Sequence, residues 1–331
     1  MENNGQSPVI AQSPAPVYPV YTVPEYVSEK EAKKRASTVH RLPNRKLYGK
    51  TDSGEYVMRW PGVVAAVFIY ILYIFAIPLL VESFMISSFS IVNPDADYDT
   101  LAHFINSSMS TVNMATYIIT AIILLLVYGR FYWDCGRELI KGIRPARALK
   151  FLWVPVVACV GVYFLEIIFS LISVLFVGTS TSENQEAVTQ MAQAVPLETL
   201  FLVIIMAPLV EETLFRGAWF RPIWYKNKWV AIIVTCVLFC LHHVWDAVLI
   251  GGNYNDLVTS ITYIPAALGF ILGYCLTKSL YGAMACHAAN NLMAILMMYI
   301  SMSCSVGSTA SEGSVGLITK LAIRISEMLV G

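Results

Sequence analysis

The pattern of hydrophobic and polar positions divides most of the chain into seven long apolar stretches separated by polar segments. Each stretch can cross the hydrocarbon core of a bilayer, which takes roughly 20 mostly apolar residues. Backbone groups in lipid must be satisfied within their own segment, so we expect these spans to be helices. The pattern therefore predicts an all-α fold, a polytopic membrane helix bundle with about seven to eight transmembrane helices. The predicted spans are 62–83, 112–129, 151–177, 197–218, 229–250, 258–277 and 280–301.

The two ends of the chain lack this long apolar pattern. Residues 1–59 combine six prolines with polar and basic side chains, which predicts a largely disordered cytoplasmic tail. Residues 60–301 are the predicted helix bundle. Residues 302–331 are predicted to contain a linker, 303–313, and a short amphipathic helix, 317–330, at the membrane interface or against the bundle. An eighth or re-entrant segment at this end is the alternative.

Composition supports a multi-pass membrane protein. Hydrophobic residues make up 57% of the chain, charged residues 13%, and the mean hydropathy is +0.63. A soluble domain would carry about a quarter charged residues, so that class is excluded. The lipid bilayer is the expected surrounding, and we expect no nucleic-acid partner.

The basic residues predict the orientation, because Lys and Arg accumulate in cytoplasmic loops. Nine of them precede the first span, and the predicted loops 86–111 and 178–196 have none. With the N-terminus in the cytoplasm, 20 of the 22 basic residues fall on the cytoplasmic side, all but Lys320 and Arg324. The protein is therefore predicted to lie in the cell membrane with its N-terminus cytoplasmic.

The fourth predicted span carries two adjacent acids, Glu211 and Glu212. Ionisable side chains inside a membrane are costly and therefore indicate a functional site. Adjacent helical residues point about 100° apart, so the two carboxylates cannot share a face. Glu212 and Arg216 are four residues apart, which predicts an ion pair on one side of the helix. Glu211 then faces elsewhere without a local partner and is the candidate general base.

Histidines mark two further spans. In the fifth span, Phe239 and His243 share a face, and Asp246 could orient His243 from the next turn. In the seventh span, His287 and Asn291 share a face. An imidazole and a carboxamide that point into one cavity can donate hydrogen bonds to a developing oxyanion.

Structural roles would explain the same residues without catalysis. The two acids could serve helix packing or a proton path. His287 and Asn291 could be an interhelical hydrogen-bonding pair worth about 1 kcal/mol. Three of the five histidines, His242, His243 and His287, lie in predicted spans, which favours a functional interpretation.

The depths of the candidate residues are compatible with one site. Counted from the cytoplasmic ends of their predicted spans, Glu211 and His287 lie about 10 Å deep and His243 about 21 Å. All three fall within a hydrocarbon core of about 30 Å. Helix tilt or a later helix start must account for the greater depth of His243.

Three linked motifs resemble the signature of a known family. They are Glu-Glu-x-x-x-Arg at 211–216, Phe-x-x-x-His at 239–243 and His-x-x-x-Asn at 287–291. In this order, on three membrane helices, they resemble the CAAX protease and bacteriocin-processing family of intramembrane endopeptidases, also called the Abi family. The resemblance covers about residues 197–301, and the motif set with the short loops indicates a bacterial plasma membrane.

The resemblance implies an intramembrane endopeptidase that hydrolyses membrane-associated or prenylated, CAAX-like peptides or proteins. Glu211 would activate a water together with His243. His287 and Asn291 would stabilise the tetrahedral intermediate. The remaining motif residues, Glu212, Arg216 and Phe239, would shape the site.

A metal is the main open point of this mechanism. Glu211, His243 and His287 would be a plausible three-ligand set for zinc. The sequence has no His-Glu-x-x-His helix to strengthen that assignment. We favour a glutamate-type peptidase without a cofactor, with zinc as the alternative.

Two other function classes remain open. A non-catalytic membrane scaffold or bacteriocin self-immunity protein would keep the fold without hydrolysis. An ion-coupled transporter would use buried acids as a proton relay, with Glu166 of the third span as an additional relay residue. The chain shows no repeated halves of the kind typical of transporters. Nothing in the sequence indicates the oligomeric state.

Overall fold

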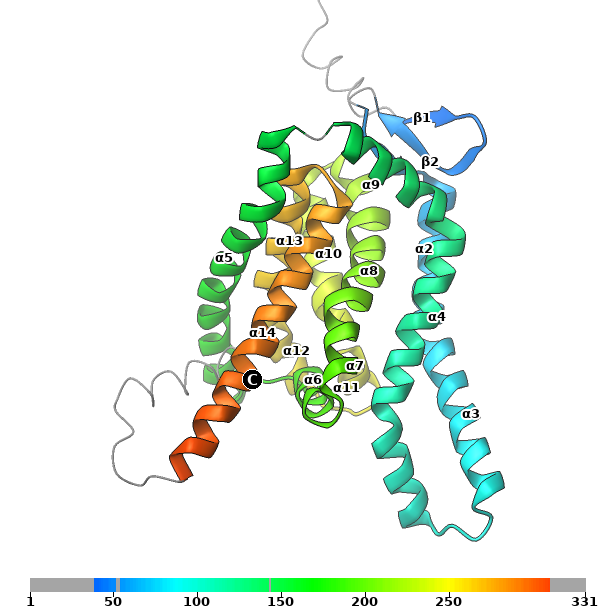
Figure 1. Cartoon of the computed structure of the whole chain (residues 1–331), viewed down its shortest axis with the longest axis vertical. Helices are drawn as coiled ribbons and strands as arrows, with labels where there is room; N and C mark the ends of the chain where they lie inside the picture. Colours follow the sequence, from blue (N-terminus) through cyan, green and yellow to red (C-terminus); the bar gives the residue numbers. More distant parts are fainter. Residues whose placement is uncertain (1–38, 52–53, 143, 310–331) are drawn as a thin grey trace, which may run out of the picture.

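The computed structural model describes residues 39–51, 54–142 and 144–309, which form a helix bundle with a small sheet at one end (Figure 1). Within these residues, five helical stretches are long and apolar enough to cross a membrane. They confirm a multi-pass membrane protein and account for the first, second, third, sixth and seventh predicted spans. The stretches are Trp60–Val92, Tyr98–Lys141, Ala148–Val177, Asn255–Thr277 and Leu280–Ser301.

The fourth and fifth predicted spans have a different form. The fourth is a helical run from Pro196 to Trp224, composed of α7 (Pro196–Phe201), η2 (Leu202–Met206), α8 (Ala207–Glu212), η3 (Thr213–Phe220) and α9 (Arg221–Trp224). The fifth was expected to continue as one helix to residue 250, and this is wrong. Helix α10 (Lys228–His242) ends earlier, and α11 (Trp245–Leu249) follows after a turn.

Prolines explain where the helices become irregular. The segments η1 (Leu72–Ala76), η2 and η3 are π-helical, and η4 (Ser260–Tyr263) is a 3₁₀ helix. Each of them ends two residues before a proline, which has no N–H and clashes with the preceding turn. A π-helical or 3₁₀ turn changes the hydrogen-bonding pattern locally and lets the helix continue. The prolines are Pro78, Pro208, Pro222 and Pro265, whereas Pro155 lies inside regular helix.

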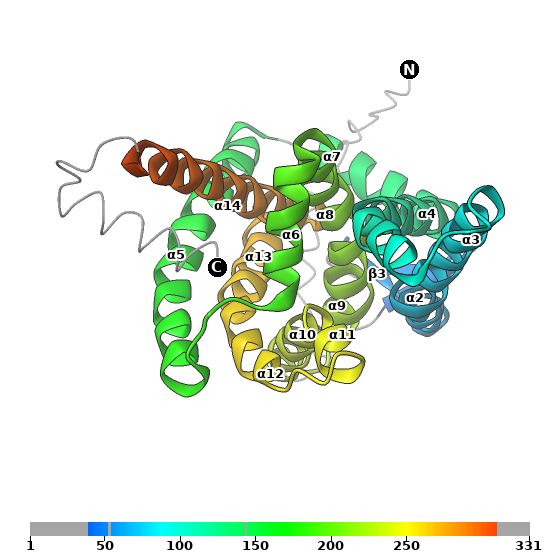
Figure 2. The ribbon, with the colours of Figure 1, turned by 90° about the horizontal axis from the view of Figure 1, so that it is seen from below.

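The bundle has a central group of helices and two flanking groups. Helices α8, α10, α13 (Ile264–Thr277) and α14 (Leu280–Thr309) lie between α5 (Pro145–Val177) on one side and α2 (Trp60–Ile71), α3 (Ile77–Val92) and α4 (Tyr98–Lys141) on the other (Figures 1 and 2). The apolar stretch of α12 (Asn255–Thr259) to α13 is 56% buried, against 17% for that of α5. Helix α13 is therefore enclosed by protein, whereas α5 presents most of its surface to lipid.

The three-stranded sheet lies at the opposite end of the bundle from α6 (Glu183–Ala194), and we call these the sheet end and the α6 end (Figure 1). Strands β1 (Val39–Leu42), β2 (Arg45–Thr51) and β3 (Tyr56–Met58) pair antiparallel in the order β1-β2-β3. The prediction of disorder is therefore wrong for these strands, while residues 1–38 lie outside the described residues.

Polar contacts hold the sheet to α4. The Tyr48 hydroxyl and the Arg45 guanidinium both donate to Asp134, at 2.5 and 3.0 Å, and Lys50 pairs with Glu138 at 3.0 Å. Burial and the neighbouring Asp134 raise the pKa of Tyr48, so its hydroxyl stays protonated and continues to donate. The sheet is thus a fixed part of the bundle.

The last described helix differs from its predicted end. Helix α14 continues to Thr309, so the expected linker does not begin at residue 303. The predicted amphipathic helix at 317–330 lies outside the described residues.

Near the start of α14, the helix lies close to α13. A Cβ at Gly273 would lie 2.4 Å from Cys286 Sγ. Glycine therefore allows α13 to approach α14 closely, next to His287.

Candidate functional site

The two adjacent glutamates point to different neighbours, as their spacing predicts. Glu212 pairs with Arg216 at 3.0 Å, which confirms the predicted ion pair. Glu211 accepts a hydrogen bond from Tyr117 of α4 at 2.8 Å and faces His243 at the end of α10. Both carboxylates are buried, with exposed fractions of 2% for Glu211 and 0% for Glu212.

Glu212 and Arg216 form the centre of a buried polar network. Glu212 Oε1 accepts from Arg216 at 3.0 Å and lies 2.9 Å from His287 Nδ1. Arg216 also donates to the Ala267 carbonyl of α13 at 3.0 Å, and its guanidinium lies 4.6 Å from the ring centroid of Phe239. A buried charge pair needs such additional partners to offset its desolvation. The network ties η3 to α13 and α14.

One carboxylate oxygen of Glu211 accepts a hydrogen bond, and the other has no partner among the described residues. Its Oε1 accepts from Tyr117, whereas Oε2 is buried without a hydrogen-bond partner among the described residues. The nearest polar atom recorded for Oε2 is His243 Nε2, at 3.9 Å. This separation is too long for a direct hydrogen bond but leaves both atoms available to one bridging water.

The hydrogen bond at the other ring nitrogen fixes the state of His243. Its Nδ1 lies 2.8 Å from the Phe239 carbonyl, which can only accept, so Nδ1 carries the hydrogen. In the neutral ring, Nε2 is then an acceptor directed toward Glu211. Asp246 does not orient this imidazole as predicted, because its carboxylate accepts from the Ala247 backbone N–H at 2.9 Å. The Phe239 carbonyl has that role.

His287 and Asn291 reach the helical run of the glutamates from α14. The Asn291 carboxamide donates to the Val203 carbonyl at 2.8 Å. In the i→i+5 pattern of η2, this carbonyl would accept from residue 208, but Pro208 has no N–H. Asn291 therefore satisfies a backbone acceptor that Pro208 leaves unpaired.

A cavity of about 140 Å³ adjoins these residues. His243, His287 and Asn291 line it, with further walls from α5, α6 and α13. Glu211 is not among the lining residues, and its Oε2 lies 3.9 Å from His243 Nε2. Glu166 also lines the cavity, and its carboxylate forms no hydrogen bond or ion pair with the rest of the described chain. Three of the four predicted catalytic residues thus line one cavity, and the fourth, Glu211, faces one of them, His243.

Tyr117 is a site residue that the sequence analysis missed. The signal for it lies in the second span, where Asn113, Thr116, Tyr117 and Thr120 recur at helical spacing within an apolar stretch. Such spacing places polar side chains on one face, and in a membrane helix that face points into the protein. A search for polar faces as well as for charges would have found Tyr117.

The observed helix ends bring Glu211 and His243 to the same depth. The run that carries Glu211 continues to Trp224, so Glu211 lies 13 residues from its end, or about 20 Å. His243 lies 15 residues from the start of α10, or about 22 Å. The predicted difference in depth between Glu211 and His243 arose because the fourth span was ended too early.

The three residues considered for zinc are not gathered around one point. Glu211 Oε2 lies 3.9 Å from His243 Nε2, and His287 directs Nδ1 to Glu212. Within the part of the chain that the structure describes, no three His, Cys, Asp or Glu side chains gather closely enough to hold a metal ion. The zinc ligand set therefore stays a prediction.

Comparison with known protein families gives a match that covers the candidate site. Residues 193–293 match the model of the family described as type II CAAX prenyl endopeptidase Rce1-like. No curated protein and no solved structure matches the chain. The matched range contains the run of the two glutamates, α10, α13 and the part of α14 with His287 and Asn291. Residues 193–293 are thus a domain of the Rce1-like type II CAAX prenyl endopeptidase family, which confirms the predicted family resemblance.

Proposed function

We propose that the protein is an intramembrane endopeptidase in which Glu211 and His243 activate a water molecule. One observation carries the proposal. Glu211 Oε2 and His243 Nε2 are two acceptors 3.9 Å apart without a hydrogen-bond partner among the described residues, and His243 lines a cavity inside the bundle. Their other atoms are held by Tyr117 and by the Phe239 carbonyl.

The two acceptors would work on one water. A water between them donates one hydrogen to the carboxylate and one to the imidazole. As its oxygen attacks the peptide carbonyl, one proton passes to this pair and a tetrahedral oxyanion forms. Collapse of the intermediate breaks the C–N bond, and the departing amine takes up the proton.

His287 and Asn291 would stabilise the oxyanion. Asn291 uses one amide hydrogen for the Val203 carbonyl and keeps the second. His287 uses Nδ1 for Glu212, so Nε2 remains for the cavity that the ring lines. For the imidazole to donate from Nε2, both ring nitrogens must carry hydrogen, with Glu212 accepting from Nδ1.

The proposed substrates are membrane-associated or prenylated peptides of the CAAX type, by analogy with the matched family. We further propose a bacterial plasma membrane as the location, with the sheet end in the cytoplasm. The distribution of Lys and Arg supports this orientation. We propose the metal-free mechanism because Glu211 and His243 together supply a base, with zinc hydrolysis as the alternative to be tested.

Cleavage of defined peptides tests the proposal. Purified protein in lipid nanodiscs is incubated with a panel of prenylated CAAX peptides and unmodified membrane peptides, with and without a strong zinc chelator. The comparison includes Glu211→Gln and, as a matched control, Glu198→Gln, an exposed glutamate at the start of the same helical run. Both variants replace a carboxylate with an amide.

We expect cleavage by the wild type and by Glu198→Gln, resistance to the chelator, and loss of cleavage in Glu211→Gln. Loss with the chelator would move the mechanism to a metalloprotease. Full activity of Glu211→Gln would contradict the assignment of the base, and no cleavage of any peptide would favour a scaffold.

A further inference from the structure

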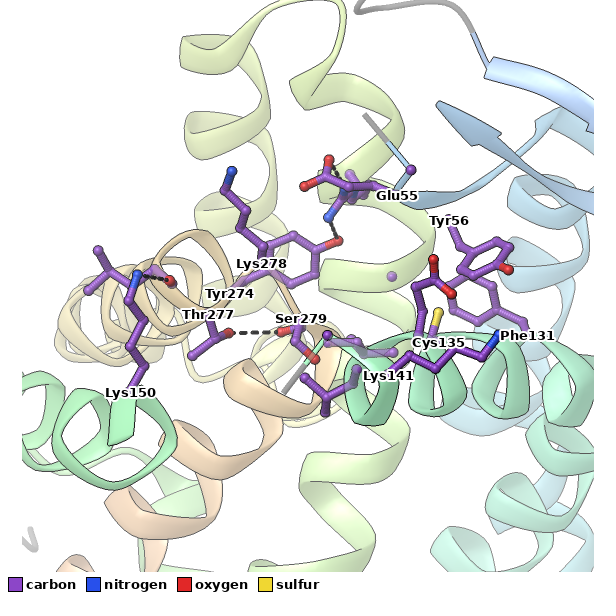
Figure 3. Close-up of a pocket in the computed structure, with 18 of the residues that line it drawn as sticks. Glu55, Tyr56, Phe131, Cys135, Lys141, Lys150, Tyr274, Thr277, Lys278 and Ser279 are labelled. Atoms are coloured by element: carbon purple, nitrogen blue, oxygen red, sulfur yellow. Dashed lines mark hydrogen bonds and ion pairs between the residues drawn. The ribbon is translucent and has the colours of Figure 1, made fainter. Parts of the chain in front are cut away.

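A second, larger pocket lies at the sheet end, apart from the candidate site. Its volume is about 750 Å³, and none of its lining residues lines the catalytic cavity. The walls come from the loop before β3, the end of α4, the start of α5, η3 with α9, and the turn between α13 and α14 (Figure 3). Four stretches of the chain that are distant in sequence therefore enclose one space, because the end of α4 and the start of α5 are consecutive.

The lining of this pocket is predominantly cationic. Two carboxylates, Glu55 and Glu138, face five basic side chains, which leaves an excess of three positive charges. Glu138 is paired with Lys50, and Glu55 accepts from Arg221 and Tyr225. Both acids are thus already neutralised. The basic residues are Lys141, Arg144, Lys150, Arg221 and Lys278.

Three of these cations have no partner among the described residues. Lys141, Arg144 and Lys278 form no ion pair or hydrogen bond with any other described residue, whereas Lys150 donates to the Leu276 carbonyl at 3.3 Å. They lie at the last residue of α4, just before α5, and between α13 and α14. Each therefore sits at the end of a membrane-length helix, at the level where lipid head groups begin.

Arg221 is a buried cation in the wall of this pocket. It is only 5% exposed, it donates to Tyr274, Glu55 and Tyr225, and its Nε has no hydrogen-bond partner among the described residues. Such a buried donor costs free energy unless a water or ligand group reaches it. Thr277 and Ser279 add hydroxyl groups to the same pocket, as Figure 3 shows.

The surroundings favour a lipid over a soluble anion. The two helices whose ends form the pocket, α4 and α5, expose large apolar side chains within the two or three turns nearest these ends. Trp133 is 63% exposed, Ile140 71%, Leu149 56% and Leu152 69%. These surfaces can hold acyl chains while a phosphate occupies the cationic pocket. We propose that the pocket binds the head group of an anionic phospholipid.

Lipid-dependent unfolding tests this proposal without relying on catalysis. The midpoint of thermal unfolding of the full-length protein in detergent is measured against dioctanoyl phosphatidylglycerol, dioctanoyl phosphatidylcholine and inorganic phosphate. A ligand that binds the folded state raises this midpoint, and the rise grows with the logarithm of its concentration above its Kd. The pocket variant is Lys141→Gln/Arg144→Gln/Lys278→Gln. Its matched control is Arg137→Gln/Lys226→Gln/Lys228→Gln, which removes three exposed cations at the same end outside the pocket.

We expect phosphatidylglycerol alone to stabilise the wild type and the control variant. The pocket variant should bind it more weakly, by about five-fold for each cation removed. The single variants Lys141→Gln and Arg144→Gln give the same information if the triple variant does not fold. Equal weakening in both triple variants, or equal stabilisation by phosphatidylcholine, would overturn the proposal. Full stabilisation by inorganic phosphate would assign the pocket to a soluble anion instead.

Discussion

At the residue scale, the site depends on how two adjacent carboxylates are separated by their partners. Glu212 contacts Arg216 and His287, so its role is to hold three helices together. Glu211 has one free oxygen next to a free imidazole nitrogen. Helical spacing was sufficient to predict this division. The hydrogen bond from Tyr117 was not predicted, because the sequence does not show which helices are neighbours.

Tyr117→Phe tests how strongly catalysis depends on the hydrogen bond that positions Glu211, the proposed base. The variant removes the hydroxyl that donates to Glu211 Oε1 and leaves the ring in place. A hydrogen bond to a charged group contributes about 1.5–3 kcal/mol, so we expect kcat to fall roughly 10- to 100-fold. Peptide cleavage kinetics measure this. Tyr128→Phe, on the same helix but bonded to the Gly62 carbonyl, should keep its kcat. Equal losses in the two variants would indicate a general packing effect.

Glu212→Gln tests the buried network. Removing one partner leaves the Arg216 charge buried without a counter-charge, which costs about 3–5 kcal/mol. We expect a clearly lower midpoint of thermal unfolding in detergent. The double variant Glu212→Gln/Arg216→Met removes both charges and should recover much of the loss. A single variant as stable as the wild type would show that the ion pair does not stabilise the bundle.

At the scale of elements, prolines decide where the site can form. Segment η2 ends two residues before Pro208, and η3 begins directly after Glu212. The two glutamates therefore lie in a short α-helical turn between two wider π-helical turns. The sequence shows the prolines plainly, but a proline predicts a kink, a break or a π-helical turn equally well. No proline lies near the end of α10 at His242, so this signal could not show that the fifth span was predicted too long.

We expect the effects of substituting Asn291 and Pro208 on the free energy of unfolding to be coupled. Asn291→Leu removes the donor to the Val203 carbonyl, and we expect a loss of about 1–2 kcal/mol in the free energy of unfolding. When Pro208 is also replaced by alanine, residue 208 gains a backbone N–H that can donate to the carbonyls of η2. In that background, Asn291→Leu should therefore lower the free energy of unfolding by less. A double-mutant cycle of unfolding free energies measures the coupling. Additive losses would contradict the proposed role of Asn291 in completing η2.

At the scale of the whole molecule, the lengths of the apolar stretches predicted most of the helix bundle. The three-stranded sheet was not predicted. Strands β1 to β3 have between three and seven residues, too short for a distinct period, and they lie among prolines and basic side chains. Contacts with α4, such as that of Tyr48 with Asp134, hold these strands in place. Contacts between segments about 85 residues apart are not visible in a local pattern.

The orientation of the bundle is testable by labelling. In a cysteine-free background, Lys226→Cys marks the sheet end and Asn93→Cys marks the short connection between α3 and α4 at the opposite end (Figure 1). An impermeant thiol reagent added to intact cells should label Asn93→Cys only. Inverted membrane vesicles should give the reverse pattern. Labelling of Lys226→Cys in intact cells would place the sheet end outside and contradict the orientation proposed from the basic residues.

The most direct test of the central claim asks whether Glu211 and His243 act on one water. The measurement is kcat for peptide cleavage by Glu211→Gln, by His243→Asn and by the double variant. A general base contributes about 10²- to 10⁴-fold, and residues that act as a unit are strongly non-additive. We predict a loss of this size in each single variant and no further loss in the double variant. Losses that multiply, or a single variant with unchanged kcat, would contradict the account.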